Sequence, residues 1–361
     1  MDKIVNSYSD SISNKVLNYI KDNAIIYDEI YRHSKPLKSS LNSEILITSY
    51  NRMKEENKNF ILIIEVGESN WFSYKNQIKI HELCEQTGVP EDKIVYITND
   101  VMCDVVYDKW FTNQTKYKTK INFINYPCLL VEDTKAKRNP APDYYNIEKF
   151  QDREVLPTKK FICLMGHSTK QRDFLWDFLK GKNGHTSYLD RKVGLPNSNV
   201  NIESLIATTF GSTSSTDRLR TYYRDSYFSI VPEGESGFAF SEKIHKPLLH
   251  GHPFILLSCN TIVDHLDIME VGVGMLDKLR EWGFETFPEL FDESYDEIDD
   301  FEKRNNNIKQ QIIKLCNMET KELHKLCVSV EEKCIHNQKI LLSLEIPNKQ
   351  LVSKLENLKN G

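Results

Sequence analysis

The sequence predicts an α/β protein with two Rossmann-like domains, in which helices cover parallel β-sheets. The first observation is a continuous apolar run at residues 60–64, which is typical of a strand buried on both faces of a parallel sheet. The second is the order strand, helix, strand that continues from this run to a second apolar run at residues 93–97. The third is the length of 361 residues, which favours two domains that each have a core.

The first predicted domain covers residues 1–156. Its central strand at 60–64 is followed by a helix to about Cys84 and, after Gly88 and Pro90, by the strand at 93–97. The β-branched residues at 45–50 predict a short strand, and residues 121–131 predict one or two more, broken by Pro127. A polar stretch with several prolines, residues 132–158, is expected to hold the boundary between the domains.

The second predicted domain covers residues 157–300 and opens with a strand at 161–165. A polar turn follows, and then a helix that carries Arg172 and has apolar residues at helical spacing. Residues 183–217 are rich in Asn, Ser, Thr and Gly and predict a loop, which either closes over a ligand or is an ordinary surface excursion. Residues 261–276 predict a short helix and a turn, and the acidic residues of 289–300 are expected to cap helices.

The most informative stretch is residues 222–258, which reads as strand, loop, helix, strand. Pro232 stops the strand, two glycines follow in an acidic loop, and Ser241 is placed to cap a helix that ends near Gly251. Unpaired amides at such a helix start suit a phosphate. Lys243 in the first turn is unfavourable for the helix dipole, and a bound anion would remove that conflict. The alternative is an ordinary β-loop-α-β unit with a solvated lysine.

Composition excludes several classes of function. The net charge of −5 gives no general attraction to nucleic acid or to an anionic membrane, so neither is an expected partner. No apolar run is long enough to form a transmembrane segment, and residues 1–15 lack the hydrophobic part of a signal peptide. The eight cysteines include no CxxC pair, which indicates buried free thiols and a cytoplasmic location.

Residues 228–233 and 236–243 resemble the nucleotide-sugar motif of α-1,3-fucosyltransferases, in which Ser/Thr-Glu-Lys opens a helix after an acidic residue and an aromatic loop. Residues 250–255 are similar to the tail of exostosin-like and viral or bacterial glycosyltransferases, except that His250 is not small. The resemblance covers roughly residues 158–260. It implies a GT-B architecture, with the two domains facing across a cleft and C-terminal helices at 301–361 that pack back across both.

The same resemblance implies donor-binding roles. Arg172 matches by position an arginine that contacts the diphosphate, Lys243 opposes phosphate charge, and Glu242 binds the ribose hydroxyls. Surface exposure or core packing is the alternative for several of these residues. The complete expected donor set is Arg172, His167, Glu233, Phe238, Phe240, Ser241, Glu242, Lys243 and Lys246.

Together these features predict an inverting glycosyltransferase that uses a GDP- or UDP-linked sugar and a glycan or glycoconjugate acceptor. Charge on the leaving diphosphate would be met by cations and helix amides, so neither a metal nor another cofactor is expected. The general base is expected at the carboxyl end of a strand in the first domain, at Glu65 or alternatively at Glu68 or Asp100. A retaining transferase of the same fold and a non-catalytic nucleotide-binding module are the alternatives.

Overall fold

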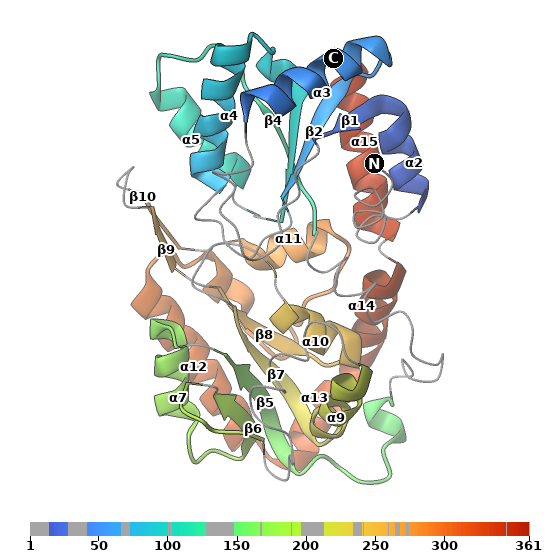
Figure 1. Ribbon diagram of the computed structural model, residues 1–361. Helices are drawn as coiled ribbons and strands as arrows, with labels where there is room; N and C mark the ends of the chain where they lie inside the picture. Colours follow the sequence, from blue (N-terminus) through green and yellow to red (C-terminus); the bar gives the residue numbers. More distant parts are fainter. Residues whose placement is uncertain are drawn as a thin grey trace. The chain divides into compact units, whose positions relative to one another are not determined.

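The computed structural model describes most of the chain, and its elements are labelled in Figure 1. Contacts divide the chain into two compact units. Unit 1 contains Met1–Glu132, Ser236–Phe240 and Leu344–Gly361, and unit 2 contains Asp133–Glu235 and Ser241–Ser343. The described residues are 14–27, 42–65, 73–99, 101, 103–127, 148–166, 168–188, 190–195, 213–233, 240, 242–258, 260–263, 268–271, 274–343 and 345–360.

Unit 1 is built on a four-stranded parallel sheet in the order β1-β2-β3-β4. Its strands are β1 Ala24–Ile26, β2 Phe60–Glu65, β3 Ile94–Thr98 and β4 Asn122–Asn125. Its helices are α2 Asn14–Asn23, α3 Ser43–Glu55, α4 Ser73–Thr87, α5 Cys103–Asn113 and α15 Glu345–Asn360, with the short 3₁₀ helix η2 Glu91–Lys93. This parallel arrangement confirms the α/β class that the apolar run at 60–64 predicts.

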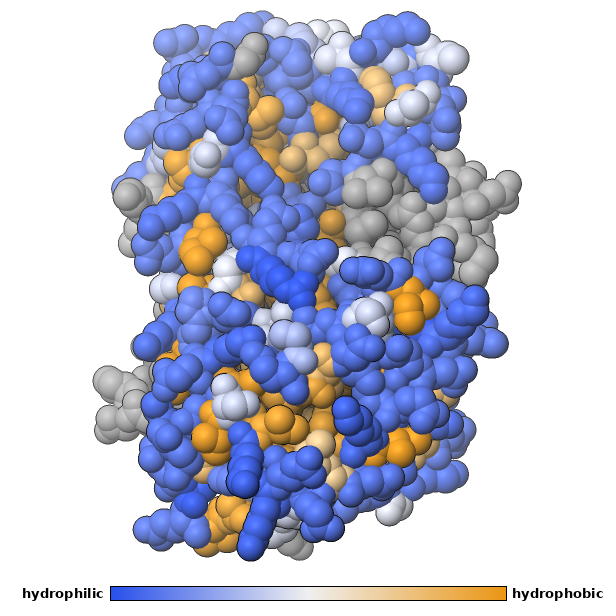
Figure 2. All heavy atoms as spheres, turned by 180° about the vertical axis from the view of Figure 1, so that it is seen from behind, coloured by the Kyte–Doolittle hydropathy of each residue, from blue (hydrophilic) through white to orange (hydrophobic). Residues whose placement is uncertain are grey.

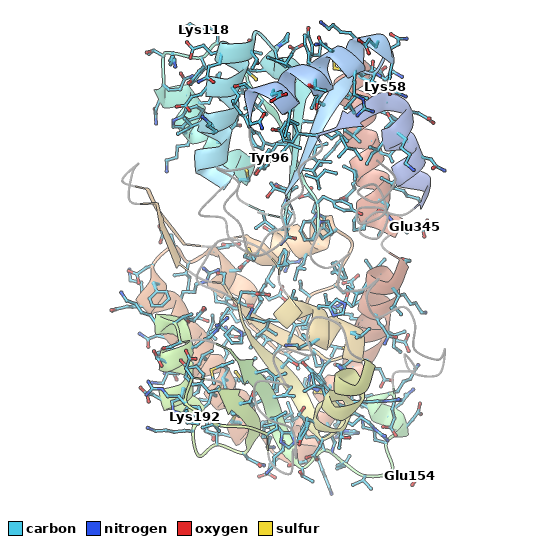
Figure 3. All side chains as sticks on the ribbon, viewed as in Figure 1. Lys58, Tyr96, Lys118, Glu154, Lys192 and Glu345 are labelled. Carbon is cyan, nitrogen blue, oxygen red and sulfur yellow. The ribbon has the colours of Figure 1, made fainter. Side chains whose placement is uncertain are left out.

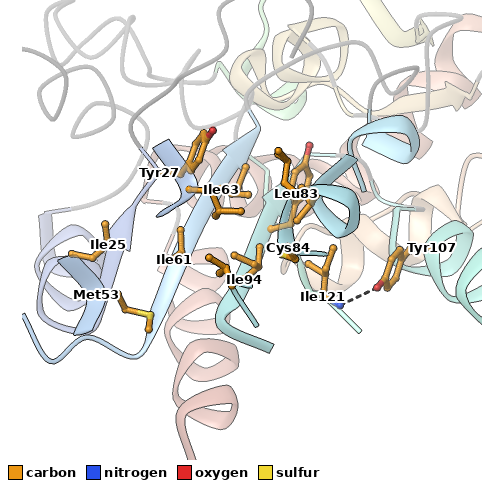
Figure 4. Close-up of a cluster of buried hydrophobic side chains, with 14 residues drawn as sticks. Ile25, Tyr27, Met53, Ile61, Ile63, Leu83, Cys84, Ile94, Tyr107 and Ile121 are labelled. Atoms are coloured by element: carbon orange, nitrogen blue, oxygen red, sulfur yellow. Dashed lines mark hydrogen bonds between the residues drawn. The ribbon is translucent and has the colours of Figure 1, made fainter. Parts of the chain in front are cut away.

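Both faces of this sheet are buried, which explains why its strands are continuous apolar runs. On one face Leu62, Ile64 and Val95 pack with Leu351 and Leu355 of α15. On the other face lies the cluster drawn in Figure 4, where the Tyr107 hydroxyl accepts a hydrogen bond from the Ile121 amide at 2.9 Å. The last helix of the chain is therefore part of the unit 1 core.

The strand predicted at residues 45–50 is wrong, because this stretch lies in helix α3. The Asn42 side chain caps the helix by accepting a hydrogen bond from the Ile45 amide at 2.9 Å. Leu46 and Met53 lie two helical turns apart, are both buried, and belong to the core cluster drawn in Figure 4. Capping and helical spacing therefore outweigh the β-propensity of the isoleucines.

Unit 2 also has a four-stranded parallel sheet, but its order is β6-β5-β7-β8. Its strands are β5 Lys159–Met165, β6 Gly184–Tyr188, β7 Ser226–Pro232 and β8 Phe254–Leu257. The antiparallel pair β9 Asn260–Val263 and β10 Ile268–Val271 follows. The helices are α7 Lys170–Leu179, α9 Thr213–Arg224, α10 Glu242–His250, α11 Met275–Glu281, α12 Phe301–Asn317, α13 Thr320–Ser329 and α14 Glu331–Ser343, with 3₁₀ helices η4 Phe150–Asp152 and η6 Glu293–Glu297.

Two other predictions for unit 2 are wrong. The stretch 183–217, predicted as a loop, contains strand β6, which lies at the edge of the sheet and pairs with β5. Its sequence Gly-His-Thr-Ser-Tyr lacks an apolar run because an edge strand has a neighbour on one side only. The stretch 261–276, predicted as a helix and a turn, contains most of the β9–β10 pair.

The acidic region 289–300 caps helices, as predicted. The Asp292 carboxylate accepts from the Ser294 amide at the start of η6, and Asp300 accepts from the Lys303 amide at the start of α12. One acid in this region is buried instead. Asp296 forms an ion pair at 3.1 Å with Arg304, and both side chains are almost completely buried.

The face of the protein drawn in Figure 2 is mainly polar. Figure 2 shows one face, on which hydrophobic side chains lie in separate groups among hydrophilic ones. In Figure 3 the labelled Lys118, Glu154 and Lys192 extend outward, whereas Tyr96 lies inside unit 1. The cysteines of the described ranges are free thiols, and most are buried. A search of those ranges for a helix with the length and hydropathy of a membrane span found none.

We expect Leu351→Ala to destabilise unit 1, because it removes a buried side chain that α15 contributes to the core. Truncating a buried leucine typically lowers the free energy of unfolding by about 2–5 kcal/mol. Lys349→Ala on the same helix is the control, since its ion pair with Glu345 is exposed. Hydrogen exchange of the β2 and β3 amides measures the effect. Equal protection in the two variants would contradict this packing role of α15.

Candidate functional site in unit 2

The strand order of unit 2 reverses between β5 and β7. The chain passes from β5 to β6 on one side and then returns to β7 on the other side of β5. In open α/β sheets, ligands bind at the carboxyl ends of the strands where the order reverses. Helices α7 and α10 follow β5 and β7, so both helices begin at this edge. The described strands of unit 1 follow chain order and have no such reversal.

The loop from β5 to α7 is held by a network centred on Asp173. Its carboxylate accepts from the Ser168 hydroxyl at 2.6 Å, from the Tyr188 hydroxyl at 2.8 Å and from the Arg191 guanidinium at 3.0 Å. These donors lower the pKa of Asp173. Thr169 caps α7 by accepting from the Arg172 amide at 3.1 Å. The loop at the end of β5 is therefore fixed by hydrogen bonds within unit 2.

The first turn of α7 also joins the ends of the neighbouring strands. Arg172, 5% exposed, donates through Nη2 to the carbonyl oxygens of Pro232 at 3.5 Å and Glu233 at 3.3 Å, just where β7 ends. Gln171, 3% exposed, donates through Nε2 to the Ser258 carbonyl at 2.8 Å, just after β8. The Oε1 atom of Gln171 has no hydrogen-bond partner in the described part of the chain. These bonds bring sequence-distant segments together at the carboxyl edge.

A small pocket lies on the side of the sheet where α9 and α10 contact β7. Its walls combine apolar strand residues with two cations on one face of α10, because Lys243 and Lys246 are three residues apart. Lys243 is the second residue of α10, which places the first of these cations at the helix start. The residues that line the pocket are Ile162, Leu164, Tyr223, Ser229, Ile230, Val231, Pro232, Lys243 and Lys246.

A buried polar network supports the wall of this pocket. The Ser229 hydroxyl lies 2.7 Å from Nδ1 of His252, whose Nε2 lies 2.9 Å from the Ser226 carbonyl oxygen. A carbonyl can only accept, so Nε2 carries the proton and Nδ1 accepts from Ser229. Tyr223 packs edge-on against His252, and its ring stacks on His250 at 4.4 Å between centroids. The network ties α9 and the segment before β8 to the centre of β7.

The described residues of the predicted donor set do not all lie in one place. Arg172, Lys243, Lys246 and the backbone of Glu233 belong to the carboxyl half of the unit 2 sheet. Glu242 is the first residue of α10. Phe240, in contrast, is completely buried and belongs to unit 1, where its carbonyl accepts from the Asn99 side chain at 3.0 Å. His167, Phe238 and Ser241 lie outside the described residues.

The predicted general bases lie in unit 1. Glu65 is the last residue of β2, and its backbone pairs in register with Thr98 of β3. Glu68 and Asp100 lie outside the described residues. Sequence reasoning missed Gln171, Asp173, Ser229 and His252. Gln171 and Asp173 could have been found as the polar neighbours of Arg172 in the sequence. Ser229 and His252 have no such signal, because they meet only through a tertiary contact.

Comparisons with known proteins give no family for this chain. No family model, no curated protein and no solved structure matches it. Within the described ranges, no group of three or more His, Cys, Asp or Glu side chains is arranged to hold a metal ion. The site is therefore interpreted from its own residues.

The buried network predicts a pH dependence of stability. Burial lowers the pKa of His252 to about 3, whereas an unfolded histidine titrates near 6.5. The folded state therefore favours the neutral ring. The contribution of His252 to the free energy of unfolding is complete above pH 6.5 and is lost as the pH falls from 6.5 toward 3. Within this window, each unit by which the pH falls lowers the free energy of unfolding by about 1.4 kcal/mol.

Urea unfolding at pH 6.5 and 5.5 measures this contribution when the wild type is compared with His252→Gln. We expect the wild type to lose about 1 kcal/mol more than the variant over that interval. The other histidines with lowered pKa, His81, His185 and His324, are present in both proteins and cancel. An identical pH dependence in the two proteins would show that His252 does not titrate in this way.

Proposed function

We propose that the protein is a glycosyltransferase that moves a sugar from a nucleotide-sugar donor to a carbohydrate hydroxyl, by inversion and without a metal. The donor would bind to unit 2 and the acceptor to unit 1, as in the GT-B transferases that the motif at 228–243 resembles. The observation that carries this proposal is the reversal of strand order between β5 and β7, because Arg172 and Lys243 belong to helices that begin at that edge.

Electrostatics support a diphosphate at this edge. Two helices begin here, and each helix start presents amide donors and the positive end of its dipole. Lys243 and Lys246 add two cations along α10, and both line the same pocket. The carboxylate of Asp173 forms an ion pair with Arg191 at 3.0 Å, which offsets part of its repulsion of an anion. The helix starts and these two cations support the proposed binding of a nucleoside diphosphate.

The proposed reaction needs charge stabilisation on one side and a base on the other. The acceptor oxygen forms a bond to the anomeric carbon of the donor, and the bond from that carbon to the diphosphate oxygen breaks. The nucleoside diphosphate leaves with the electron pair, and the hydroxyl proton passes to a carboxylate. Lys243 and the amides at the start of α10 would stabilise the leaving group. Glu65, at the carboxyl end of β2, would serve as the base.

The remaining residues would position the donor. Arg172 uses its guanidinium to hold the carbonyls at the end of β7, so its main role would be to fix the loop that precedes α10. Contact of the same guanidinium with phosphate stays a prediction. Gln171 offers a buried acceptor oxygen beside the end of β8, which suits a hydroxyl or N–H group of the donor.

We expect Lys243→Ala to weaken binding of UDP or GDP, whichever the wild type binds, by at least tenfold. The variant removes a charge-assisted contact, and a tenfold loss corresponds to about 1.4 kcal/mol. Isothermal titration calorimetry at low and high salt measures the loss. Lys180→Ala is the matched control, because Lys180 is an exposed lysine at the opposite end of α7. Equal affinity in all three proteins would refute a diphosphate site at α10.

Transfer itself is tested with wild type and Glu65→Gln on GDP- and UDP-sugars, with release of the nucleoside diphosphate as the readout. We expect the variant to lose most of its rate while its affinity for the nucleotide is unchanged, since the base acts on the acceptor. EDTA is expected to leave the wild-type rate unchanged. Tight nucleotide binding without turnover on any acceptor would instead indicate a nucleotide-binding module.

A further inference from the structure

Ser229 of β7 is a polar side chain in the wall of the unit 2 pocket. It pairs in register with Ile162 of β5, and residues paired in this way in a parallel sheet have side chains on the same face. Ile162 packs with Tyr223 of α9, so this is the face that α9 covers. All three residues line the pocket, and the other strand residues in its lining are apolar. The Ser229 side chain therefore faces the pocket from the strand side.

The Ser226 carbonyl fixes the direction of the hydrogen bonds around Ser229. A carbonyl only accepts, so Nε2 of His252, which lies 2.9 Å away, donates to it. Burial lowers the pKa of His252, so the ring is neutral and its Nδ1 atom accepts. The Ser229 hydroxyl, 2.7 Å from Nδ1, therefore gives its proton to the ring. The serine oxygen then offers only lone pairs to a further partner.

This direction selects the kind of group that can contact Ser229. An oxygen whose proton is already engaged attracts N–H and O–H groups and repels an unprotonated phosphate oxygen, which is also an acceptor. Lys243 and Lys246 line the same pocket and have the opposite preference, because their ammonium groups attract anions. A ligand that satisfies both preferences must carry an anionic group together with a neutral hydrogen-bond donor.

The size of the pocket limits how much of such a ligand it holds. It contains about 250 Å³ of space, its open side included, whereas pockets that bury a whole small ligand have about 300–1,000 Å³. The pocket therefore holds one part of a nucleotide rather than all of it. Ser229 is 2% exposed, so a group that reaches it leaves bulk water, and a missing hydrogen bond there is not replaced by solvent.

We propose that Ser229 is a specificity-determining residue, which accepts a hydrogen bond from an N–H or O–H group of the bound nucleotide. Two parts of a nucleotide carry such a donor, namely the ribose hydroxyls and the N–H group of a uracil or guanine ring. His252 sets the preference of Ser229, since its Nδ1 atom holds the serine proton. The inference rests on the proposed function, because the nucleotide belongs to the proposed donor substrate.

Calorimetry on the full chain with nucleotide analogues tests the assignment. The probes are UDP and GDP, their 2′-deoxy and 3′-deoxy forms, 3-methyl-UDP and 1-methyl-GDP. For the nucleotide that the wild type binds, we expect the analogue that lacks the contacting O–H or N–H group to bind about tenfold more weakly or worse. Which analogue binds weakly identifies the ribose or the base as the source of the donor.

In Ser229→Ala and Ser229→Cys this discrimination should disappear. Cysteine fills the position with a weak acceptor, so it separates the lost hydrogen bond from the added space. Ser187→Ala is the matched control, because Ser187 is a buried serine of the neighbouring edge strand β6 and lies outside the pocket lining. The control should keep the discrimination of the wild type, and melting temperatures confirm that each variant folds.

The outcomes separate this inference from the proposed function. If the wild type binds all analogues of one nucleotide equally, or if both serine variants keep its discrimination, Ser229 holds only ordered water and the inference is overturned. Nucleotide binding would in that case still support the donor site. Discrimination that depends on Ser229, without sugar transfer to any acceptor, supports the inference and refutes the transferase. Binding of neither nucleotide overturns both.

Discussion

The structure depends on the burial of parallel strands on both faces. Strands β2, β3, β5 and β7 are almost completely buried, and their apolar side chains pack against helices on each side. Such strands hold few polar side chains along their length, with Ser229 of β7 an exception, so polar groups accumulate where the strands end. Both groups of candidate functional residues lie at such ends. Lys243 follows β7 in unit 2, and Glu65 ends β2 in unit 1.

This constraint also explains which parts of the fold could be predicted from sequence. Residues 60–64 are apolar along their whole length, and residues 227–231 are apolar apart from Ser229; both strands lie where the sequence predicts them. Strand β6 is an edge strand, so its Gly-His-Thr-Ser-Tyr sequence carries no such pattern and reads as a loop. The isoleucines at 45 and 47 have high β-propensity, but the Asn42 cap and the burial of Leu46 make the segment helical.

The site was predictable to a similar extent. The placement of Lys243 at the start of a helix follows from local sequence, and so does the early position of Arg172 in α7. The partners of Arg172 do not, because the carbonyls of Pro232 and Glu233 lie about sixty residues away in sequence. The pairing of Ser229 with His252 is equally non-local. Only the order of the strands brings these residues together, and order is a property of the whole sheet.

Strand order also distinguishes what each unit can do. In unit 2 the reversal beside β5 opens the carboxyl edge between α7 and α10, which begin after different strands, and cations line this region. In unit 1 the described strands follow chain order, so nothing comparable separates its helices, and Glu65 is the last residue of β2 at its carboxyl edge. A phosphate requires positive charge and open amides, whereas the attack of a hydroxyl requires a base. In the proposed transfer reaction, the carboxyl edge of unit 2 would hold the donor diphosphate, and Glu65 of unit 1 would accept the proton of the acceptor hydroxyl.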